Sequence, residues 1–403
     1  MVESVTLVEQ HLIRRTDARF ALIDAAAFAS KNLYNAATYL VRQAFIHQGR
    51  WLRWAPLYHL LKTHDAYQAL PRKVSNLVLK QVDLAWKAYF AALEAWRQDP
   101  SQFLARPCLP GYKDKTQGRN LLQYDRQALS RVGLRQGLVQ PSQLGITLET
   151  RQTQVQQVRI VPRKGYYMVE VVYEHDVQPA AVTPTLVASI DIGLSNLATL
   201  TSNKRGFQPL VVNGRPLKAM NQYYNQEKAR LQAELPTGQR TSHRIRDLTA
   251  NRNRKVRHYL HGASRLVIDH LVAEGIGTLV LGRNKQWKQA IALGRQTNQA
   301  FVAVPFAEFI QMLTYKAQLV GITVLLQEES YTSKCSFLDQ EPIHKHDRYL
   351  GKRIQRGLFR AADGRLINAD VNGSYNILKK AVPNAFADGI EGVAVHPRRV
   401  LPA

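Results

Sequence analysis

The stretch LVASIDIG (186–193) decides the fold predicted for the C-terminal half of the chain. It is an apolar run that ends in Asp191 and Gly193, as a buried strand does when a ligand site lies at its C-terminal end. Five further segments have the apolar patterns of strands or helices: NLATLTS (196–202), GTLVLG (277–282), AFVAVPFAEFIQMLTYKAQLVG (300–321), ITVLLQEE (322–329) and INADVNGSYNILKKAV (367–382). Their patterns predict, in this order, a strand, a strand, a helix, a strand and a helix. This order is typical of an α/β domain with a central mixed sheet.

The preceding half of the chain shows a different pattern of apolar residues, with helical spacing over much of its length. Residues 3–14 are predicted to form a strand, and helical spacing of apolar residues follows over about 19–48, 51–61 and 74–97. The segment RPCLPGYKDKTQGRN (106–120) cannot hold a helix, and residues 121–176 contain short β-type runs typical of a small antiparallel barrel or sheet. After a linker near 179–185, residues 216–273 form a basic helical hairpin. The fold class predicted is therefore α+β, with several domains.

The charge of the chain points to a polyanionic partner. Fifty-five Lys and Arg residues stand against 30 Asp and Glu residues, which gives a formal net charge of +25. The excess is spread over the whole length, so nucleic acid is favoured over a membrane surface. Cys108 and Cys335 are the two cysteines, far apart in sequence, which excludes a disulfide framework and a four-cysteine zinc site. No signal peptide or apolar run of 18 residues is present, and we expect a cytoplasmic protein with no membrane partner.

Two aspartates are the first candidates for chemistry. Phosphodiester hydrolysis requires an activated water and neutralisation of the attacking and leaving oxygens, which two Mg²⁺ ions roughly 4 Å apart supply. Asp191 ends the first strand of the α/β domain, and Asp370 begins its last helix, where it can lean over the sheet. A turn residue and a helix cap are the plain structural interpretations of the two positions. Together with the basic context, they favour Mg²⁺, or Mn²⁺ in its place.

The segments SIDIG (189–193), YTSKCS (331–336) and ADVNGSYNIL (369–378), in this order and with a basic helical stretch between them, resemble the RuvC-type nuclease domain of the transposon-encoded TnpB family. KNLYNAATY (31–39) and RPCLPGYKDK (106–115) are similar to its recognition lobe and the barrel that follows. The resemblance implies a small β-barrel built from residues 1–15 and 106–180, with a helical recognition lobe inserted at 16–105. It also implies a ribonuclease H-like (RuvC) nuclease domain at 181–403, with a basic insert at about 336–366.

The resemblance also implies a function and its partners. Members of the family use an omega-type guide RNA to cleave double-stranded DNA next to a short motif, and they are prokaryotic proteins that meet their target in the nucleoid. Asp191 would be the first metal-binding acid and Asp370 the third. We expect a monomer, although the sequence does not fix the oligomeric state.

The chain departs from the family pattern at the second acid. A glutamate is expected where this chain has Gly282, followed by Arg283, Asn284 and Lys285. Glu328 or Glu329 is the best substitute, because both end the adjacent strand ITVLLQEE and neighbouring parallel strands end on the same rim of a sheet. Alternate side chains face opposite sides, so only one of the two should reach the metal. The sequence does not tell which.

A second departure concerns zinc. The family often carries a four-cysteine finger after the YTS segment, whereas this chain has only Cys335 there. Zinc is therefore not expected, and the basic insert would contact nucleic acid without it. Residues predicted to bind nucleic acid are Arg252, Arg254, Lys255, Arg257, Trp287, Lys288, Lys352 and Arg353. Residues that could orient a phosphate or a metal-bound water are Ser333, Lys334, Asn372 and Ser374.

The sequence thus predicts a Mg²⁺-dependent, RNA-guided DNA endonuclease with Asp191, Asp370 and one of Glu328 and Glu329 as its acids. The main alternative is an RNA-guided DNA-binding protein whose nuclease is disabled by Gly282. The basic surface serves both functions, so the charge does not separate them. A DNA-strand transferase is a third reading, since such enzymes also use carboxylate triads.

Overall fold

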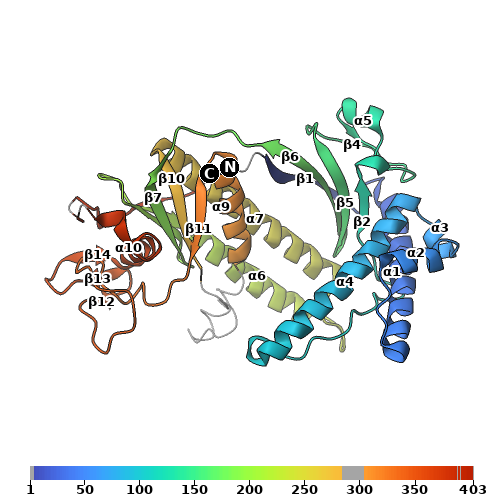
Figure 1. Cartoon of the computed structure of the whole chain (residues 1–403), viewed down its shortest axis with the longest axis horizontal. Coiled ribbons are helices and arrows are strands. Elements are labelled where there is room, and N and C mark those ends of the chain that lie inside the picture. The colour runs from blue at the N-terminus through green and yellow to red at the C-terminus, as the bar shows by residue number, and fades with distance from the viewer. Residues whose placement is uncertain (1–3, 284–303, 388, 391, 403) are drawn as a thin grey trace. The chain divides into compact units, whose positions relative to one another are not determined.

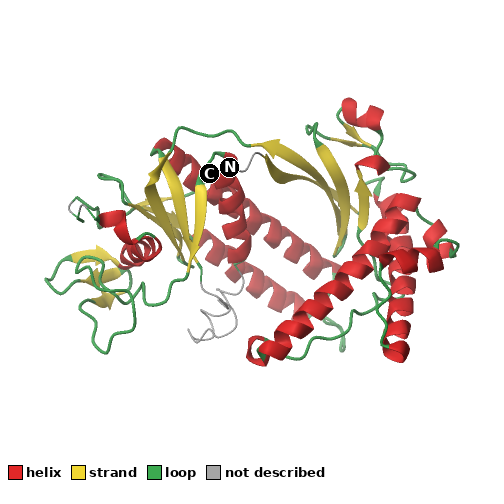
Figure 2. Ribbon diagram, viewed as in Figure 1, coloured by secondary structure: helices red, strands yellow, loops and turns green. Residues whose placement is uncertain are grey.

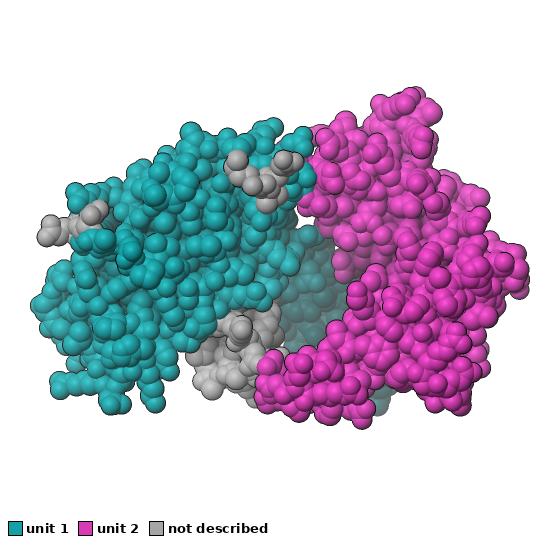
Figure 3. Space-filling view, in the orientation of Figure 1, with its two compact units in different colours: residues 1–5, 176–403 teal, residues 6–175 magenta. Residues whose placement is uncertain are grey.

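The computed structural model describes residues 4–283, 304–387, 389–390 and 392–402. The chain divides into two compact units, Thr6–His175 and a second unit formed by Met1–Val5 with Asp176–Ala403 (Figure 3). Each is described by itself below. Among the described residues no helix is both long and apolar enough to span a membrane.

Unit Thr6–His175 combines helices with a four-stranded sheet (Figures 1 and 2). The helices are α1 (Phe20–Gln48), α2 (Trp54–Leu61), α3 (Asp65–Gln68), α4 (Arg72–Gln98) and α5 (Arg131–Arg135). The sheet has the order β1-β6-β5-β2, formed by β1 (Ser4–Arg14), β6 (Tyr166–Asp176), β5 (Val155–Arg163) and β2 (Leu122–Asp125). A separate short pair is formed by β3 (Leu138–Val139) and β4 (Leu148–Glu149). The strand order leaves β1 and β2 at the two edges, so closure into the predicted barrel is not seen in the described residues.

Two hydrophobic clusters hold this unit together. One lies among the helices, where Trp86, Leu57 and Val41 are completely buried. The other joins the start of α1 and α4 to the sheet through residues such as Ile23 and Val74. The helices α1 and α4 link the helical lobe to the sheet, because each contributes residues to both clusters.

The second unit is built on a six-stranded sheet with the order β11-β10-β7-β8-β9-β15. Its strands are β7 (Thr183–Ile192), β8 (Asn196–Ser202), β9 (Leu210–Asn213), β10 (Ile276–Gly282), β11 (Thr323–Gln327) and β15 (Arg398–Val400). β7, β8 and β9 run antiparallel in succession, whereas β10 and β11 are parallel to β7. The predicted mixed sheet is present in this unit.

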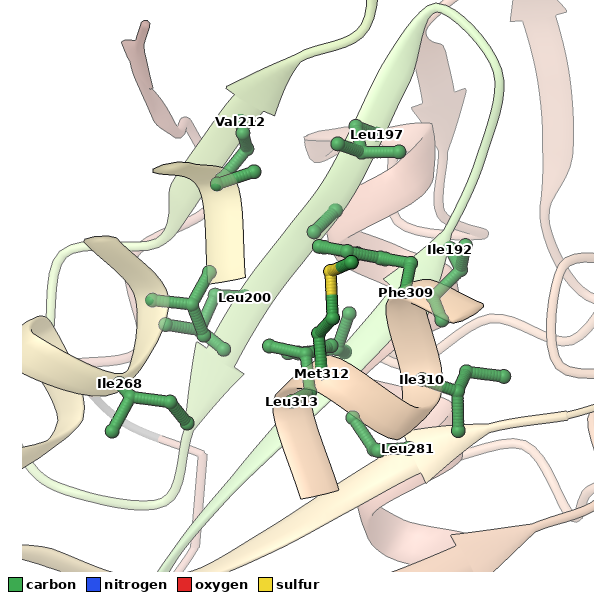
Figure 4. Packing of buried hydrophobic residues seen from close by; sticks show 14 of the residues in the cluster. Ile192, Leu197, Leu200, Val212, Ile268, Leu281, Phe309, Ile310, Met312 and Leu313 are labelled. Carbon is green, nitrogen blue, oxygen red and sulfur yellow. The ribbon is translucent and has the colours of Figure 1, made fainter. Parts of the chain in front are cut away.

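Helices cover both faces of this sheet, as Figures 1 and 2 show. The helices of the unit are α6 (Arg215–Ala233), α7 (His243–Ala273), α9 (Phe306–Leu319) and α10 (Ala369–Ala381). α7 and α9 bury one face, where Phe309, Met312 and Leu313 pack against strand residues such as Leu200 (Figure 4). α10 packs on the opposite face through Ile377 and Leu378.

The insert between β11 and α10 forms a small sheet of its own. Its strands are β12 (Lys352–Gln355), β13 (Leu358–Arg360) and β14 (Leu366–Asn368), paired antiparallel in the order β12-β13-β14. Phe359 and Ile367 of this sheet share a buried cluster with Tyr375 of α10 and with Phe337, which precedes the sheet in the chain. The insert is thereby packed against the start of the helix that carries Asp370.

Candidate active site

Side-chain alternation along β7 places Asp191 under α10. Ala188, Ile190 and Ile192 belong to the apolar core on the α7 and α9 side. Ser189 and Asp191 therefore point to the other face, since successive strand residues face opposite sides. β10 is in parallel register with β7, with Leu281 opposite Ile190, so that the two strands end together at Asp191 and Gly282.

The first turns of α10 are fixed closely to this face. The side chain of Asn368 caps the helix by accepting hydrogen bonds from the Asp370 and Val371 amides at 3.0 and 3.2 Å. One turn later the Ser374 Oγ lies 3.1 Å from the Ser189 carbonyl and 3.0 Å from the Thr199 carbonyl. These buried bonds hold the helix backbone against the sheet.

Gly373 allows the close approach of α10 to Asp191. A Cβ atom at this position would lie 3.0 Å from Asp191 Oδ2. A larger side chain would therefore push the helix away from the carboxylate or the carboxylate away from the helix. Because Asp370 lies on the same turn as Gly373, the close packing brings Asp370 near Asp191.

Both carboxylate oxygens of Asp370 have protein donors. Asn196 Nδ2, at the start of β8, donates a hydrogen bond of 2.6 Å to Oδ2. Arg353 Nη2, on β12, donates to Oδ1 at 3.4 Å. The carboxylate is thus oriented from the sheet on one side and from the insert on the other.

Asp191 has a strongly shifted proton affinity. Burial raises the pKa of Asp191 to about 7, the negative charge of Asp370 adds to this increase, and Arg353 opposes it. Such a carboxylate favours either a proton or a cation nearby. Strong shifts of this origin are typical of functional sites.

The two candidate glutamates have different environments. Glu328 is exposed and turns to Lys380, whose Nζ donates to Oε2 at 2.8 Å, and to the Ser330 amide at 2.8 Å. Lys380 and Ser330 are the leading hydrogen-bond partners that lower the pKa of Glu328 against the opposing effect of burial. Glu328 therefore behaves as an ordinary surface acid.

Glu329 instead points toward the end of β10. A Cβ atom built on Gly282 would overlap Glu329 Oε1 and lie 2.8 Å from Glu329 Cδ, so the carboxylate occupies the space of a side chain at position 282. Burial raises the pKa of Glu329 to about 8, and the charges of Asp191 and Glu328 add to it. The Glu329 carboxylate therefore lies where the side chain of a larger residue at position 282 would begin.

The acids are brought together in pairs and do not form a tight triad. Asp191 interacts electrostatically with Asp370 and with Glu329. In the described part of the chain no group of three or more Asp, Glu, His or Cys side chains is gathered closely enough to hold a metal ion.

Other polar residues near the site serve the fold. Asn372 accepts from the Phe337 amide and donates to the Cys335 carbonyl, both at 2.9 Å, and Asn376 donates to the Thr332 carbonyl at 2.9 Å. With Ser374, they bind α10 to the YTSKCS segment and to the sheet. Ser333 and Lys334 are exposed, and Lys334 lies over the ring of Tyr349. Asn372 and Ser374 are therefore structural, which corrects their assignment as phosphate- or water-orienting groups.

The predicted nucleic-acid contacts are spread over α7 and β12. Arg254, Lys255, Lys352 and Arg353 are exposed. Arg252 donates to Asn221 at 2.8 Å, and Arg257 forms an ion pair with Glu308 at 2.8 Å, so both also contribute to packing within the unit. Trp287 and Lys288 lie outside the described residues.

Sequence reasoning missed three residues that shape the site. Asn196 orients Asp370, Gly373 admits Asp191, and Lys380 draws Glu328 away. A signal was available for Gly373, because a glycine inside an otherwise helical pattern often marks a close approach. Asn196 and Lys380 gave no such signal, since their partners are distant in sequence.

Two family models match this unit. A model described as a probable transposase (OrfB_IS605) matches residues 170–288, and a model described as the TNB domain of Cas12f1-like proteins matches residues 306–377. A curated relative, a TnpB-like protein of Acidianus two-tailed virus, is 24% identical over 391 residues that cover 88% of this chain and 82% of the relative.

A solved structure has the same overall fold. It is a Cas12f1 protein in complex with a single-guide RNA and target DNA, with a TM-score of 0.55 and 13% identity. The match covers 89% of this chain and 82% of that protein. The likeness supports a mixed α/β multidomain fold of the kind found in Cas12 effectors.

Proposed function

We propose that this chain, a TnpB-type protein, is an RNA-guided endonuclease that cleaves double-stranded DNA with Asp191, Glu329 and Asp370 as its acids. The observation that carries the proposal is the place of Glu329, whose carboxylate fills the space above Gly282 and faces Asp191. Asp191 on β7 thus interacts electrostatically both with Glu329, which follows β11, and with Asp370 at the start of α10. The Cas12f1 protein whose solved structure resembles this chain is in complex with a single-guide RNA and target DNA, which supports the proposed partners.

The unit that carries the acids is best understood as a ribonuclease H-like domain of the RuvC type. Three successive antiparallel strands, β7 to β9, are extended by the parallel strands β10 and β11. α10 lies across the face that presents Asp191. This is the arrangement expected when the first acid ends a central strand and the third begins a helix.

The chemistry of these acids suits a hard divalent cation, although such an ion would have to draw the three carboxylates closer together than they lie in the structure. Mg²⁺, or Mn²⁺ in its place, would be held by oxygens of Asp191, Glu329 and Asp370, because such ions take carboxylate ligands and keep several waters. Bound there, the ion would activate water and stabilise the leaving oxygen of the phosphodiester. Burial chiefly raises the pKa values of Asp191 and Glu329 and repulsion between carboxylates adds to it, and a cation bound nearby would offset both effects.

Residues of the chain itself would prepare the acids for this task. Asn196 fixes Asp370 by its bond to Oδ2, while Oδ1 accepts the longer bond from Arg353. Arg353 and Arg356 both belong to the insert, and Arg356 Nη2 donates to Ser195 Oγ at 3.0 Å. Their charges suit a phosphate that approaches the acids.

Guide RNA and target DNA are the partners that the proposal requires. The excess of Lys and Arg suits two nucleic-acid strands held through their phosphates. Base pairing would supply the sequence recognition while the protein recognises the shape and backbone of the RNA–DNA duplex. An omega-type RNA from the transposon end remains the guide that we propose.

A nuclease-dead binding protein is the competing function, favoured by Gly282 alone. The two functions differ in what Glu329 should do. We would measure cleavage of a target plasmid by protein co-purified with its own RNA, in Mg²⁺, and compare Glu329→Gln with the matched control Glu328→Gln. We expect Glu329→Gln and Asp191→Asn each to lower the rate by about 10³-fold or more, because each removes a ligand needed in the transition state.

The control sets the interpretation of this experiment. Glu328→Gln changes the same charge one residue away and should leave the rate within about threefold, as an exposed surface acid does. Binding of the target by all variants would show that only chemistry is lost. If the wild-type protein binds its target and never cuts it, or if Glu328→Gln is the inactive variant, the proposed site is wrong.

A further inference from the structure

The insert between β11 and α10 is held by a buried carboxylate. Glu341 is 2% exposed, and each of its oxygens accepts a backbone N–H from a different end of the loop at 336–350. Oε2 accepts from the Ser336 amide at 2.7 Å and Oε1 from the Leu350 amide at 2.9 Å. One side chain therefore ties the beginning of the loop to its end.

The tied end of the loop leads directly into β12. Lys352 begins this strand two residues after Leu350, and the strand delivers Arg353 to Asp370 and the following Arg356 to Ser195. The other end of the loop is fixed independently. Asn372 of α10 accepts a hydrogen bond from the Phe337 amide and donates one to the Cys335 carbonyl, both at 2.9 Å. These two residues flank Ser336, whose amide donates to Glu341.

We infer that Glu341 is a positioning residue, which sets β12 on the helix that carries Asp370 and so holds Arg353 at the acid site. The inference rests on the proposed nuclease function for its catalytic consequence. Its structural part is supported by the two hydrogen bonds that Glu341 accepts and by the burial of its carboxylate.

A carboxylate suits this task better than its neutral isostere. Both oxygens of Glu341 accept from amides, and an ionised carboxylate can satisfy both N–H groups. In Glu341→Gln the amide nitrogen replaces one acceptor and faces an N–H donor. One of the two loop ends is then released while the size of the side chain is kept.

The first experiment measures amide hydrogen exchange in the purified full chain. We would compare Glu341→Gln with Asp347→Asn, which removes the same charge from an exposed acid of the same loop. We expect exchange over residues 350–355 to rise about tenfold or more in Glu341→Gln only, because the strand loses its tether. Peptides from β7 and β10, which belong to the same unit as Glu341, should stay unchanged, which shows that this unit is folded.

The outcome that overturns the positioning role is equally clear. If only the Ser336 and Leu350 amides exchange faster while β12 remains protected, Glu341 caps a loop and positions nothing. Equal exchange in both variants would also overturn it. Neither result depends on whether the protein cuts DNA.

The second experiment asks whether Glu341 acts through Arg353. We would measure single-turnover cleavage for Glu341→Gln, Arg353→Ala and the double variant. We expect each single variant to be about tenfold slower and the double variant no slower than Arg353→Ala, since residues that act through one another are not additive. Effects that multiply to about 100-fold would refute the inference. If wild type does not cleave at all, the proposed function fails, and the exchange result alone decides the inference.

Discussion

The two faces of the six-stranded sheet follow opposite rules. Toward α7 and α9, β7 presents Ala188, Ile190 and Ile192 to a core of aliphatic and aromatic side chains. Toward α10, the same strand presents Ser189 and Asp191. Ser189 forms hydrogen bonds with Ser374 of the helix, and Asp191 lies close to the helix backbone at Gly373. Because one face supplies the hydrophobic burial, the other can hold carboxylates that repel each other. Stability and chemistry are thus divided between alternate residues of one strand.

The largest effect should come from opening the apolar face. Phe309 is fully buried on α9 and packs toward the sheet (Figure 4). Phe309→Ala should lower the free energy of unfolding of this unit by about 3–5 kcal/mol, because a large cavity remains. Urea unfolding followed by amide exchange in β7 measures this effect, with the exposed Gln311→Ala as control. Undiminished stability would show that the two faces do not divide the work as described.

An intermediate effect is expected from the polar face at Gly282. In Gly282→Ala the new Cβ would lie 2.8 Å from Glu329 Cδ and 2.9 Å from Ile377 Cδ1. Because the carboxylate is the end of a flexible side chain, it should move aside, and we expect cleavage to fall about 10–100-fold with a change in stability below about 1.5 kcal/mol.

The control for this substitution is Gly111→Ala, where nothing lies within 4 Å of the added Cβ. Single-turnover cleavage and urea unfolding should be measured on both variants. A variant that unfolds easily and yet cuts normally when folded would contradict the placement of Glu329 against Gly282.

The smallest effect on stability is expected from Lys316, a buried lysine of α9 on the apolar side of the sheet. Lys316 of α9 is 5% exposed and donates to the His261 carbonyl and Ser264 Oγ, both at 2.7 Å. Burial lowers the pKa of Lys316 from 10.5 to about 8, and Arg265 adds to the decrease. Between these values the unfolded chain binds more protons, so the contribution of Lys316 makes the protein more stable as the pH rises from 8 to 10.5.

Lys316→Met should remove this pH dependence. The wild-type free energy of unfolding should gain about 1–2 kcal/mol relative to the variant between pH 8 and 10, judged from the pKa shift. Urea unfolding of both proteins at the two pH values measures the difference. Parallel pH profiles would show that the lysine is solvated in the folded state.

Much of the second unit could be predicted from its sequence. Apolar runs that end in Asp191 and Gly282 predicted the central strands, and the helical period of residues 300–321 predicted α9. These signals are local, and burial on both sides of the strands reinforces them. The structure adds that β7 pairs with β10 in parallel, which the long connection between the two strands permits.

The choice between Glu328 and Glu329 could not be predicted. Alternation alone says that the two face opposite sides, and the backbone after β11 leaves the strand before it reaches them. In the structure the Glu329 carboxylate lies against Gly282, and Glu328 is paired with Lys380 on another element. Both are tertiary contacts between residues far apart in sequence.

The order of the strands in the first unit was equally hidden. β1 lies at one edge and β2 at the other, although the barrel predicted from the resemblance would have closed them on each other. Strand pairing over long sequence distances depends on the packing of α1 and α4 beneath the sheet, which no local pattern records.

The Glu329 carboxylate occupies the volume that a side chain at position 282 would need, so both positions cannot carry a large side chain in this conformation. A glutamate introduced at position 282 would clash with Glu329, and a glycine at position 329 would leave this volume unfilled. A lineage can therefore pass from one arrangement to the other only by two substitutions, with a crowded or a vacant site between them. Comparison of such proteins position by position would overlook this exchange, because the carboxylate beside position 282 comes from a residue that follows another strand.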